Sequence, residues 1–357
     1  MKRKVAVILI ALVLAAATLL CGCNEIEKGE STWTPSHGDP EVKPKATATE
    51  DQLVAFGAYP NTVAPNEIST AFKNIKIDDV TGLWVEEETE RKDGEGNVIG
   101  KTVCKYDIQT GYYVREETVN GETTVTYYAK EGNKFYLVQE IQWIILKDLG
   151  DSYLLVSREL LDAKPMMDAY GQGTWEESTL RDWLNGTDDY ARGGEKFVES
   201  WNFFDRAFSE EERAALRSVT NVTADNAMFG TPGGNTTTDL VYTFSAEELN
   251  DAFGTISKQA ATTPYAAKRG VVAEYKTRLG SWWIRSSGMN TYFQGIDRKG
   301  DLSEGGFASN DKTIGVRPVI TVAKSAVRTI DNTLPTAGPI ETPTPNPTVR
   351  PTEKSEG

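Results

Sequence analysis

Gly280-Ser-Trp-Trp-Ile-Arg-Ser-Ser-Gly288 is the stretch that decides the fold of this 357-residue chain. Paired tryptophans, an isoleucine and an arginine stand there between glycines. A later stretch, Gly315-Val-Arg-Pro-Val-Ile-Thr-Val322, again sets apolar residues around one arginine. Bulky aromatic and β-branched residues bounded by glycines are typical of buried strands with tight turns. The two motifs together predict an irregular antiparallel β core in the last third of the chain.

Four residues of these motifs are expected to form scaffold, namely Trp282, Trp283, Arg285 and Arg317. Tryptophan buries a large apolar area once its N–H finds an acceptor. Arginine presents five donors in one plane, which suits it to holding loop carbonyls or carboxylates in place. We therefore interpret the tryptophans as core residues and the arginines as structural ties.

A helical pattern lies further upstream, in Thr174-Trp-Glu-Glu-Ser-Thr-Leu-Arg-Asp-Trp-Leu-Asn185. Its apolar residues Leu180, Trp183 and Leu184 recur at the spacing of one helix face. This stripe predicts a short helix, with Trp183 in the core.

Further helices are marked by their ends. Ser209 and Ser245 are each followed three residues later by glutamate, which is the pattern of a capping box. A proline at the first position and a glycine after the last mark another helix. The predicted helices span about 210–218 and 246–253, and from Thr263-Pro264 to Gly270.

A β-rich insertion is expected over residues 66–137. Strand patterns alternate there with turn dipeptides, and Asn120-Gly121 between two alternating runs is a strong hairpin signal. Two apolar runs follow, 141–146 and 152–157, and predict a buried hairpin. The fold class is therefore expected to be α+β, with a few short helices and an inserted β-rich segment.

Residues 1–22 have the composition of a secretory signal, with basic residues before an apolar run. Gly22 directly before Cys23 is similar to the lipobox of bacterial lipoproteins, in which the cysteine becomes acylated. Cys21 is the poorer acceptor because Leu20 stands where a small residue is wanted. We expect Cys23 to hold the protein at the extracytoplasmic face of the bacterial cell membrane. An uncleaved anchor is the alternative and gives the same topology.

Two segments of biased composition flank the expected domain of residues 51–330. Residues 23–50 are rich in charged residues, proline and threonine, and are expected to form a lipid-anchored, disordered linker. Residues 331–357 repeat proline and threonine too densely for a packed core, so we expect a disordered tail.

The residue inventory excludes several classes of function. With 38 basic and 52 acidic residues the net charge is −14, which argues against a nucleic acid partner. The single histidine, His37, lies in the linker, so neither a Ser-His-Asp triad nor a histidine-ligated metal site can be assembled. Cys104 stands in an alternating strand pattern and is expected to be a half-buried, inert thiol. No cofactor is expected.

A set of ordered anchors resembles the bacterial domain-of-unknown-function family 6273, over roughly residues 51–323. The resemblance implies a C-type-lectin-like fold on a cell surface, a fold that also underlies formylglycine-generating enzymes. Those enzymes use paired cysteines, and no cysteine follows Cys104. The chain departs from the family in the insertion and at 188–200. Its anchors are Phe56–Tyr59, Trp143–Leu146, Leu161-Asp162, Thr174-Trp175, Ser178–Asn185, Ala207–Ser209, Thr263–Ala266, Trp282–Ser286 and Gly315–Pro318.

A ligand-binding site is expected in the loops between the two late motifs. Tyr292, Gln294, Phe307 and Asn310 flank glycine-marked turns there, and loops on a rigid scaffold commonly carry function. We predict that they lie on one exposed face and bind an extracellular ligand such as a glycan or peptide. The alternative is that they merely line hairpin turns.

The expected function is therefore that of a cell-surface lipoprotein with a non-catalytic module that binds a glycan, a peptide or an envelope component. Two alternatives remain open, a surface hydrolase that uses paired carboxylates and a purely structural envelope protein. Calcium is not expected at Asp297–Glu304, because Arg298 and Lys299 interrupt its carboxylates and their spacing does not match an EF loop.

Overall fold

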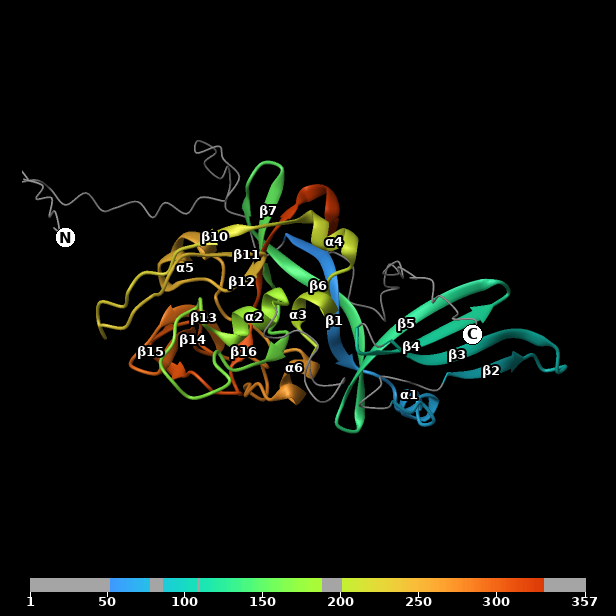
Figure 1. The fold of residues 1–357 in the computed structure, drawn as a ribbon. Coiled ribbons are helices and arrows are strands. Elements are labelled where there is room, and N and C mark those ends of the chain that lie inside the picture. Colours follow the sequence, from blue (N-terminus) through green and yellow to red (C-terminus); the bar gives the residue numbers. More distant parts are fainter. Residues whose placement is uncertain (1–51, 78–85, 108–109, 188–200, 331–357) are drawn as a thin grey trace, which may run out of the picture. The chain divides into compact units, whose positions relative to one another are not determined.

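Two largely antiparallel sheets carry the fold, with short helices between the strands (Figure 1). The expected signal segment, linker and tail, with Cys23 and His37, lie outside the described residues, and so does the interruption at 188–200. The computed structural model of the chain describes residues 52–77, 86–107, 110–187 and 201–330.

The larger sheet is built on β6, which pairs with β1 along one edge and with β5 and then β7 along the other. The β6–β7 pairing confirms the predicted buried hairpin. Strands follow the order β12-β17-β7-β6-β5-β4-β3-β2, with β1 and β18 beside β6 and β9 beside β17. The strands are β1 (Leu53–Val63), β2 (Glu87–Lys92), β3 (Val98–Asp107), β4 (Tyr112–Val119), β5 (Glu122–Glu131), β6 (Lys134–Asp148), β7 (Ser152–Ser157), β9 (Leu216–Arg217), β12 (Val241–Tyr242), β17 (Val319–Ala323) and β18 (Arg328–Thr329).

The tryptophan motif forms β13 inside the smaller sheet, and every residue of that strand is buried. β13 pairs antiparallel with β14 and, through Trp282 and Gly315, parallel with β16. The two sequence motifs are thus neighbouring strands. The order is β15-β14-β13-β16-β8. The strands are β8 (Asp162–Ala163), β13 (Trp282–Ser287), β14 (Tyr292–Ile296), β15 (Leu302–Ala308) and β16 (Gly315–Val316), with a separate pair β10 (Val219–Asn221) and β11 (Thr237–Asp239).

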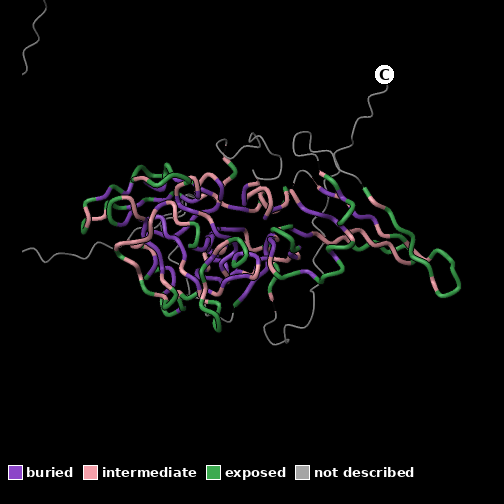
Figure 2. The backbone as a smooth tube through the Cα atoms, turned by 90° about the horizontal axis from the view of Figure 1, so that it is seen from below, coloured by how far each residue is buried: buried purple, intermediate pink, exposed green. Residues whose placement is uncertain are grey.

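The β-rich segment within residues 66–137 is continuous with the larger sheet, because β2 to β5 follow β6 in one ladder. Asn120 and Gly121 have φ angles of 52° and 87°, the left-handed conformation that the tight turn between β4 and β5 requires. α1 (Asn66–Ala71) is followed by Phe72, whose ring lies 5.2 Å from both Tyr113 and Phe135. Figure 2 shows exposed and intermediate residues toward the far turns of this ribbon, away from the buried core.

The capping boxes at Ser209 and Ser245 are both present. In each, the serine side chain accepts a hydrogen bond from the backbone amide of the glutamate three residues later, and the side chain of that glutamate accepts one from the serine backbone amide. α5 has the predicted bounds. The helix predicted at 210–218 is too long, because α4 ends at Ala215, and Leu216 turns away to pair with β17 and bury its side chain. The helices are α2 (Thr179–Asn185), α3 (Phe203–Ala207), α4 (Glu210–Ala215), α5 (Ala246–Phe253), the third predicted helix α6 (Pro264–Arg269), and the 3-10 turn η2 (Lys324–Ala326).

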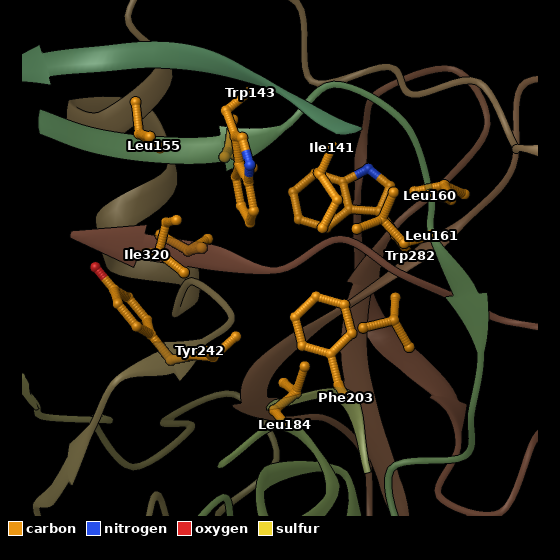
Figure 3. Close-up of a cluster of buried hydrophobic side chains, with 14 of the residues drawn as sticks. Ile141, Trp143, Leu155, Leu160, Leu161, Leu184, Phe203, Tyr242, Trp282 and Ile320 are labelled. Carbon is orange, nitrogen blue, oxygen red and sulfur yellow. The ribbon is translucent and has the colours of Figure 1, made fainter. Parts of the chain in front are cut away.

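One apolar core joins the two sheets, with side chains drawn from both of them and from α2 and α3 (Figure 3). Trp143 of β6 donates its indole N–H to the Phe56 carbonyl at 2.7 Å. Trp282 donates to the Lys258 carbonyl at 3.0 Å, and Trp283 to that of Lys164 at 2.8 Å. These rings are therefore buried without leaving a donor unsatisfied. The prediction that Trp282 and Trp283 are core residues is confirmed.

The structure also tests the predicted burial of Trp183 and Cys104. Trp183 is buried in the core, as its helical spacing predicts. Cys104 is buried rather than half-buried, and burial raises the pKa of its thiol. A thiol that is harder to ionise is a weaker nucleophile at neutral pH, in keeping with an apolar role. In the described part of the chain, no helix is both long and apolar enough to cross a membrane.

Arg285 ties the smaller sheet to α5. Its guanidinium is fully buried and pairs with both carboxylate oxygens of Glu248, the glutamate of the α5 capping box. It also donates to the carbonyls of Thr243 at 2.6 Å and Val222 at 3.1 Å. One buried cation thus orients a helix start and two loops, which confirms its interpretation as a structural tie.

We predict that Arg285→Ala lowers the free energy of unfolding by about 3–5 kcal/mol, because it leaves the Glu248 carboxylate without its buried partner. Arg298→Ala removes the same side chain from an exposed turn, and should change stability by less than about 0.5 kcal/mol. Urea unfolding of the purified chain measures both. Equal stability of the two variants would contradict this account of Arg285.

Candidate functional site

The described structure has a pocket of about 690 Å³, within the size range of small-ligand sites. We call it the arginine pocket because Arg158, Arg278, Arg317 and Arg328 all line it. Residues of β1, β6 and β18 form one side, and residues between Ser257 and Pro264 form the other. It therefore lies where the larger sheet meets the segment before α6.

The chain enters this pocket as it leaves β7. Arg158 donates its amide to the Gln142 carbonyl at 2.9 Å, which keeps it beside β6. Two residues later the Leu160 amide bonds to the Ala261 carbonyl at 2.8 Å, so the backbone has crossed to the opposite wall. Arg158 and Glu159 are thus held at the point where the two walls meet.

Arg317 forms the base of the pocket and links it to the core. Its side chain is fully buried, with the guanidinium carbon 5.1 Å from the Trp282 ring centre and 5.3 Å from that of Phe253. It donates to the carbonyls of Ser157 and Lys258, each at 3.0 Å. Since Trp282 also donates to the Lys258 carbonyl, both sequence motifs fix the segment that forms the pocket wall. Arg317 is a structural tie, as predicted, and it also borders the pocket.

Arg278 has a left-handed backbone, with φ of 59°. A tight turn holds it in this conformation. The Arg278 amide donates to the Glu274 carbonyl at 2.8 Å, and the Glu274 amide donates to the Leu279 carbonyl at 2.9 Å. Such a conformation costs energy for any residue with a Cβ atom, and it commonly occurs where a side chain must be aimed. Here the aimed side chain is one of the pocket arginines.

Two of the pocket arginines form ion pairs. Arg328 contacts both carboxylate oxygens of Glu140, and Arg278 lies 3.4 Å from Glu159. Arg158 instead donates to the side-chain oxygen of Gln142 at 2.6 Å. Four arginines against two glutamates give the lining a net positive charge, although the whole chain is acidic.

Carboxamides are the other frequent side chains of the pocket. Asn61, Gln139, Gln142 and Gln259 all line it, and each carries both a donor and an acceptor. Gln259 is also steadied by its side-chain bond to the Arg298 carbonyl at 3.3 Å. The lining drawn from the described residues includes no aromatic side chain. The pocket is therefore polar and suited to hydrogen bonding rather than to stacking.

The four residues predicted as the binding site do not share an exposed face. Gln294 is only 3% exposed, and its amide donates to the Glu304 carbonyl at 3.0 Å and to the Glu304 carboxylate at 3.1 Å. Tyr292 and Asn310 are partly buried. The prediction of one exposed face is therefore wrong for Gln294, and none of the four lines the arginine pocket.

Phe307 is likewise held by packing, since its ring lies 5.9 Å from the Trp283 ring in an edge-to-face arrangement. The two rings meet above Gly295, where a Cβ atom would lie 2.7 Å from the Phe307 ring. A glycine in β14 thus lets Phe307 reach across the strand. The glycine that marked this segment as a functional loop in the sequence serves strand packing.

Asp297 accepts the backbone amides of Lys299 at 2.8 Å and Asp301 at 3.0 Å. This carboxylate stabilises the turn between β14 and β15, as an aspartate commonly does at a tight turn. Within the described ranges, no group of three or more metal-ligating side chains comes together.

A partly buried polar cluster joins β1, β5, β8 and α6. Tyr59 donates to Asp162 at 2.7 Å, and Arg269 of α6 donates to Asp162 at 3.2 Å and to Glu131 at 2.8 Å. Burial first, and then the Asp162 charge, raise the pKa of Tyr59, which stays a neutral donor. The cluster joins α6 to the end of β5, so it fixes one wall of the pocket relative to the insertion.

Comparison with known families covers the later part of this architecture. Residues 150–324 match the family model DUF6273, a domain of unknown function. The match begins after β6, so the expected coverage from residue 51 is too long at its start, although β1 and β6 share the core. No curated protein and no solved structure matches the chain.

We predict that Arg278→Gly is more stable than Arg278→Ala by about 0.5–1 kcal/mol, because glycine adopts a left-handed φ without strain. Both variants lose the arginine side chain, so their difference isolates the backbone. Urea unfolding of the two proteins measures it. A more stable alanine variant would show that the turn at Arg278 is not strained.

Proposed function

We propose that this chain is an extracytoplasmic surface protein, lipid-anchored through Cys23, whose folded part binds a polar ligand in the arginine pocket without catalysis. The expected ligand classes remain a glycan, a peptide or another envelope component. The C-type-lectin-like arrangement implied by the family resemblance belongs to the same proposal.

The observation that carries this proposal is the chemistry of the pocket lining. Arginine and carboxamide side chains surround a cavity of about 690 Å³, and several of them are already fixed by bonds to neighbouring groups. A cavity of this size can hold a small ligand, and placed polar groups in it fix the orientation of the ligand. The buried Arg317 below them keeps the base of the pocket rigid.

A surface hydrolase is the second candidate, because Glu140 and Glu159 line the same pocket. Glycoside hydrolysis requires one carboxyl group to donate a proton and the other to act as base or nucleophile. Arg328 contacts both carboxylate oxygens of Glu140, and Arg278 lies 3.4 Å from Glu159, so each carboxylate already has a cationic partner. We therefore place binding first. Release of reducing sugar from a glycan, lost in both Glu140→Gln and Glu159→Gln, would reverse that order.

We predict that Ser257→Trp abolishes ligand binding, because an indole at this exposed pocket residue fills the opening. The measurement is a combined glycan and peptide array, probed with the chain and the variant. Ser325→Trp is the control, since Ser325 is exposed and lies outside the pocket. Retained binding by Ser257→Trp would remove the pocket as the site, and no ligand at all would favour the structural envelope protein.

We predict that Cys23→Ser moves the protein from the membrane fraction to the soluble fraction, because the acyl chains supply the stable attachment. Cys21→Ser serves as the matched control and should leave the membrane fraction unchanged. Cell fractionation in high salt followed by immunoblotting measures both. Continued membrane retention of Cys23→Ser would contradict the lipid anchor.

A further inference from the structure

We propose that the ligand of the arginine pocket is a short acidic peptide segment, whose side-chain carboxylates pair with Arg158, Arg278 and Arg328. This inference rests on the proposed binding function and names its ligand class. It follows from the charge, the geometry and the carboxamide content of the pocket.

Charge supports an anionic ligand. The pocket carries an excess of arginines over glutamates, although the chain has a net charge of −14. A concave surface with a net charge opposite to that of the whole protein attracts ligands of opposite charge. An acidic segment is therefore drawn to this pocket rather than to the surrounding surface.

Arg158 is the anchor of the proposed complex. It is exposed and lines the pocket, and its bond to Gln142 uses one nitrogen of the guanidinium. Among the residues that the structure describes, no carboxylate lies within ion-pair distance of it. A planar guanidinium with donors in one fixed plane binds a carboxylate in two-point geometry. Arg158 thus offers a preformed carboxylate site.

Arg278 and Arg328 line the same pocket as Arg158, and each already has a carboxylate partner. The Arg278 contact with Glu159 is 3.4 Å long, and half of the Arg278 side chain is exposed. Arg328 is also about half exposed, at the other end of the pocket rim. An exposed single contact contributes little to stability, so Arg278 can share a second carboxylate at low cost. Arg328 keeps its two-point contact with Glu140 and offers the N–H donors at Nη1 that Glu140 does not engage.

The side chains of the lining, which include no aromatic ring among the described residues, favour a peptide over a glycan. Asn61, Gln139 and Gln259 each present a donor and an acceptor, which is the combination that a peptide bond presents in return. The described lining offers no aromatic ring on which a sugar could stack. Leu53, Ile144 and other apolar residues complete the lining and fit the methylene groups of glutamate side chains.

The test uses the full mature chain and two fluorescein-labelled peptides of equal length, one alternating glutamate with alanine and one alternating glutamine with alanine. Fluorescence anisotropy should show binding of the glutamate peptide at least about tenfold tighter than the glutamine peptide. The affinity should fall as salt rises from about 0.05 M to about 0.5 M. Equal binding of the two peptides would overturn the inference.

Arginine variants locate the interaction. Arg158→Gln, Arg278→Gln and Arg328→Gln should each weaken binding by about twofold to fivefold, and the triple variant by at least about tenfold. Arg298→Gln is the matched control, since it removes an exposed arginine outside the pocket and should bind as the unaltered chain does. Circular dichroism confirms that each variant is folded. Unchanged binding by the folded triple variant would overturn the inference.

Two outcomes separate this inference from the proposed function. If Ser257→Trp loses an array ligand that is neutral or is an acidic glycan, while the glutamate peptide does not bind, the pocket is a binding site and the acidic peptide is wrong. If no ligand is sensitive to Ser257→Trp, the proposed function falls and the inference falls with it.

Discussion

The contact of the Arg317 guanidinium with the rings of Trp282 and Phe253, which also lie against each other, is the interaction on which the rest of the structure depends. A guanidinium in the apolar interior is tolerated because its charge lies against two ring faces and its N–H groups meet the carbonyls of Ser157 and Lys258. These two carbonyls belong to the end of β7 and to the segment before α6. One side chain therefore holds together the two sheets and both walls of the cavity.

The part of the fold that local chemistry controls could be read from the sequence. The capping box at Ser245 fixes where α5 begins, and Asn120-Gly121 fixes the turn between β4 and β5. Burial of Trp282 and Trp283 follows from their size and their place in an apolar run. Each of these features is decided within a few residues of chain, so no knowledge of distant partners is needed.

The cavity could not be read in the same way, because its residues come together only through pairing of distant strands. Asn61, Gln142 and Arg328 lie far apart in sequence and meet only because β1, β6 and β18 are neighbours. The prediction for Gln294 was wrong for the same reason. Its side-chain amide is buried and donates to Glu304 on the adjacent strand, a partner that the sequence around Gln294 does not reveal. One usable signal was present: Arg158 and Glu159 are charged residues directly after a buried strand.

The pairing of β18 with the start of β1 decides how the folded part responds to mechanical load. The Ile330 amide bonds to the Leu53 carbonyl, and Thr329 and Arg328 face Val54 and Ala55 in an antiparallel register. The chain therefore enters and leaves on the same side of this short ladder. Tension between residues 53 and 330 therefore loads the bonds between β1 and β18 one after another, starting from the Ile330–Leu53 bond, rather than all together.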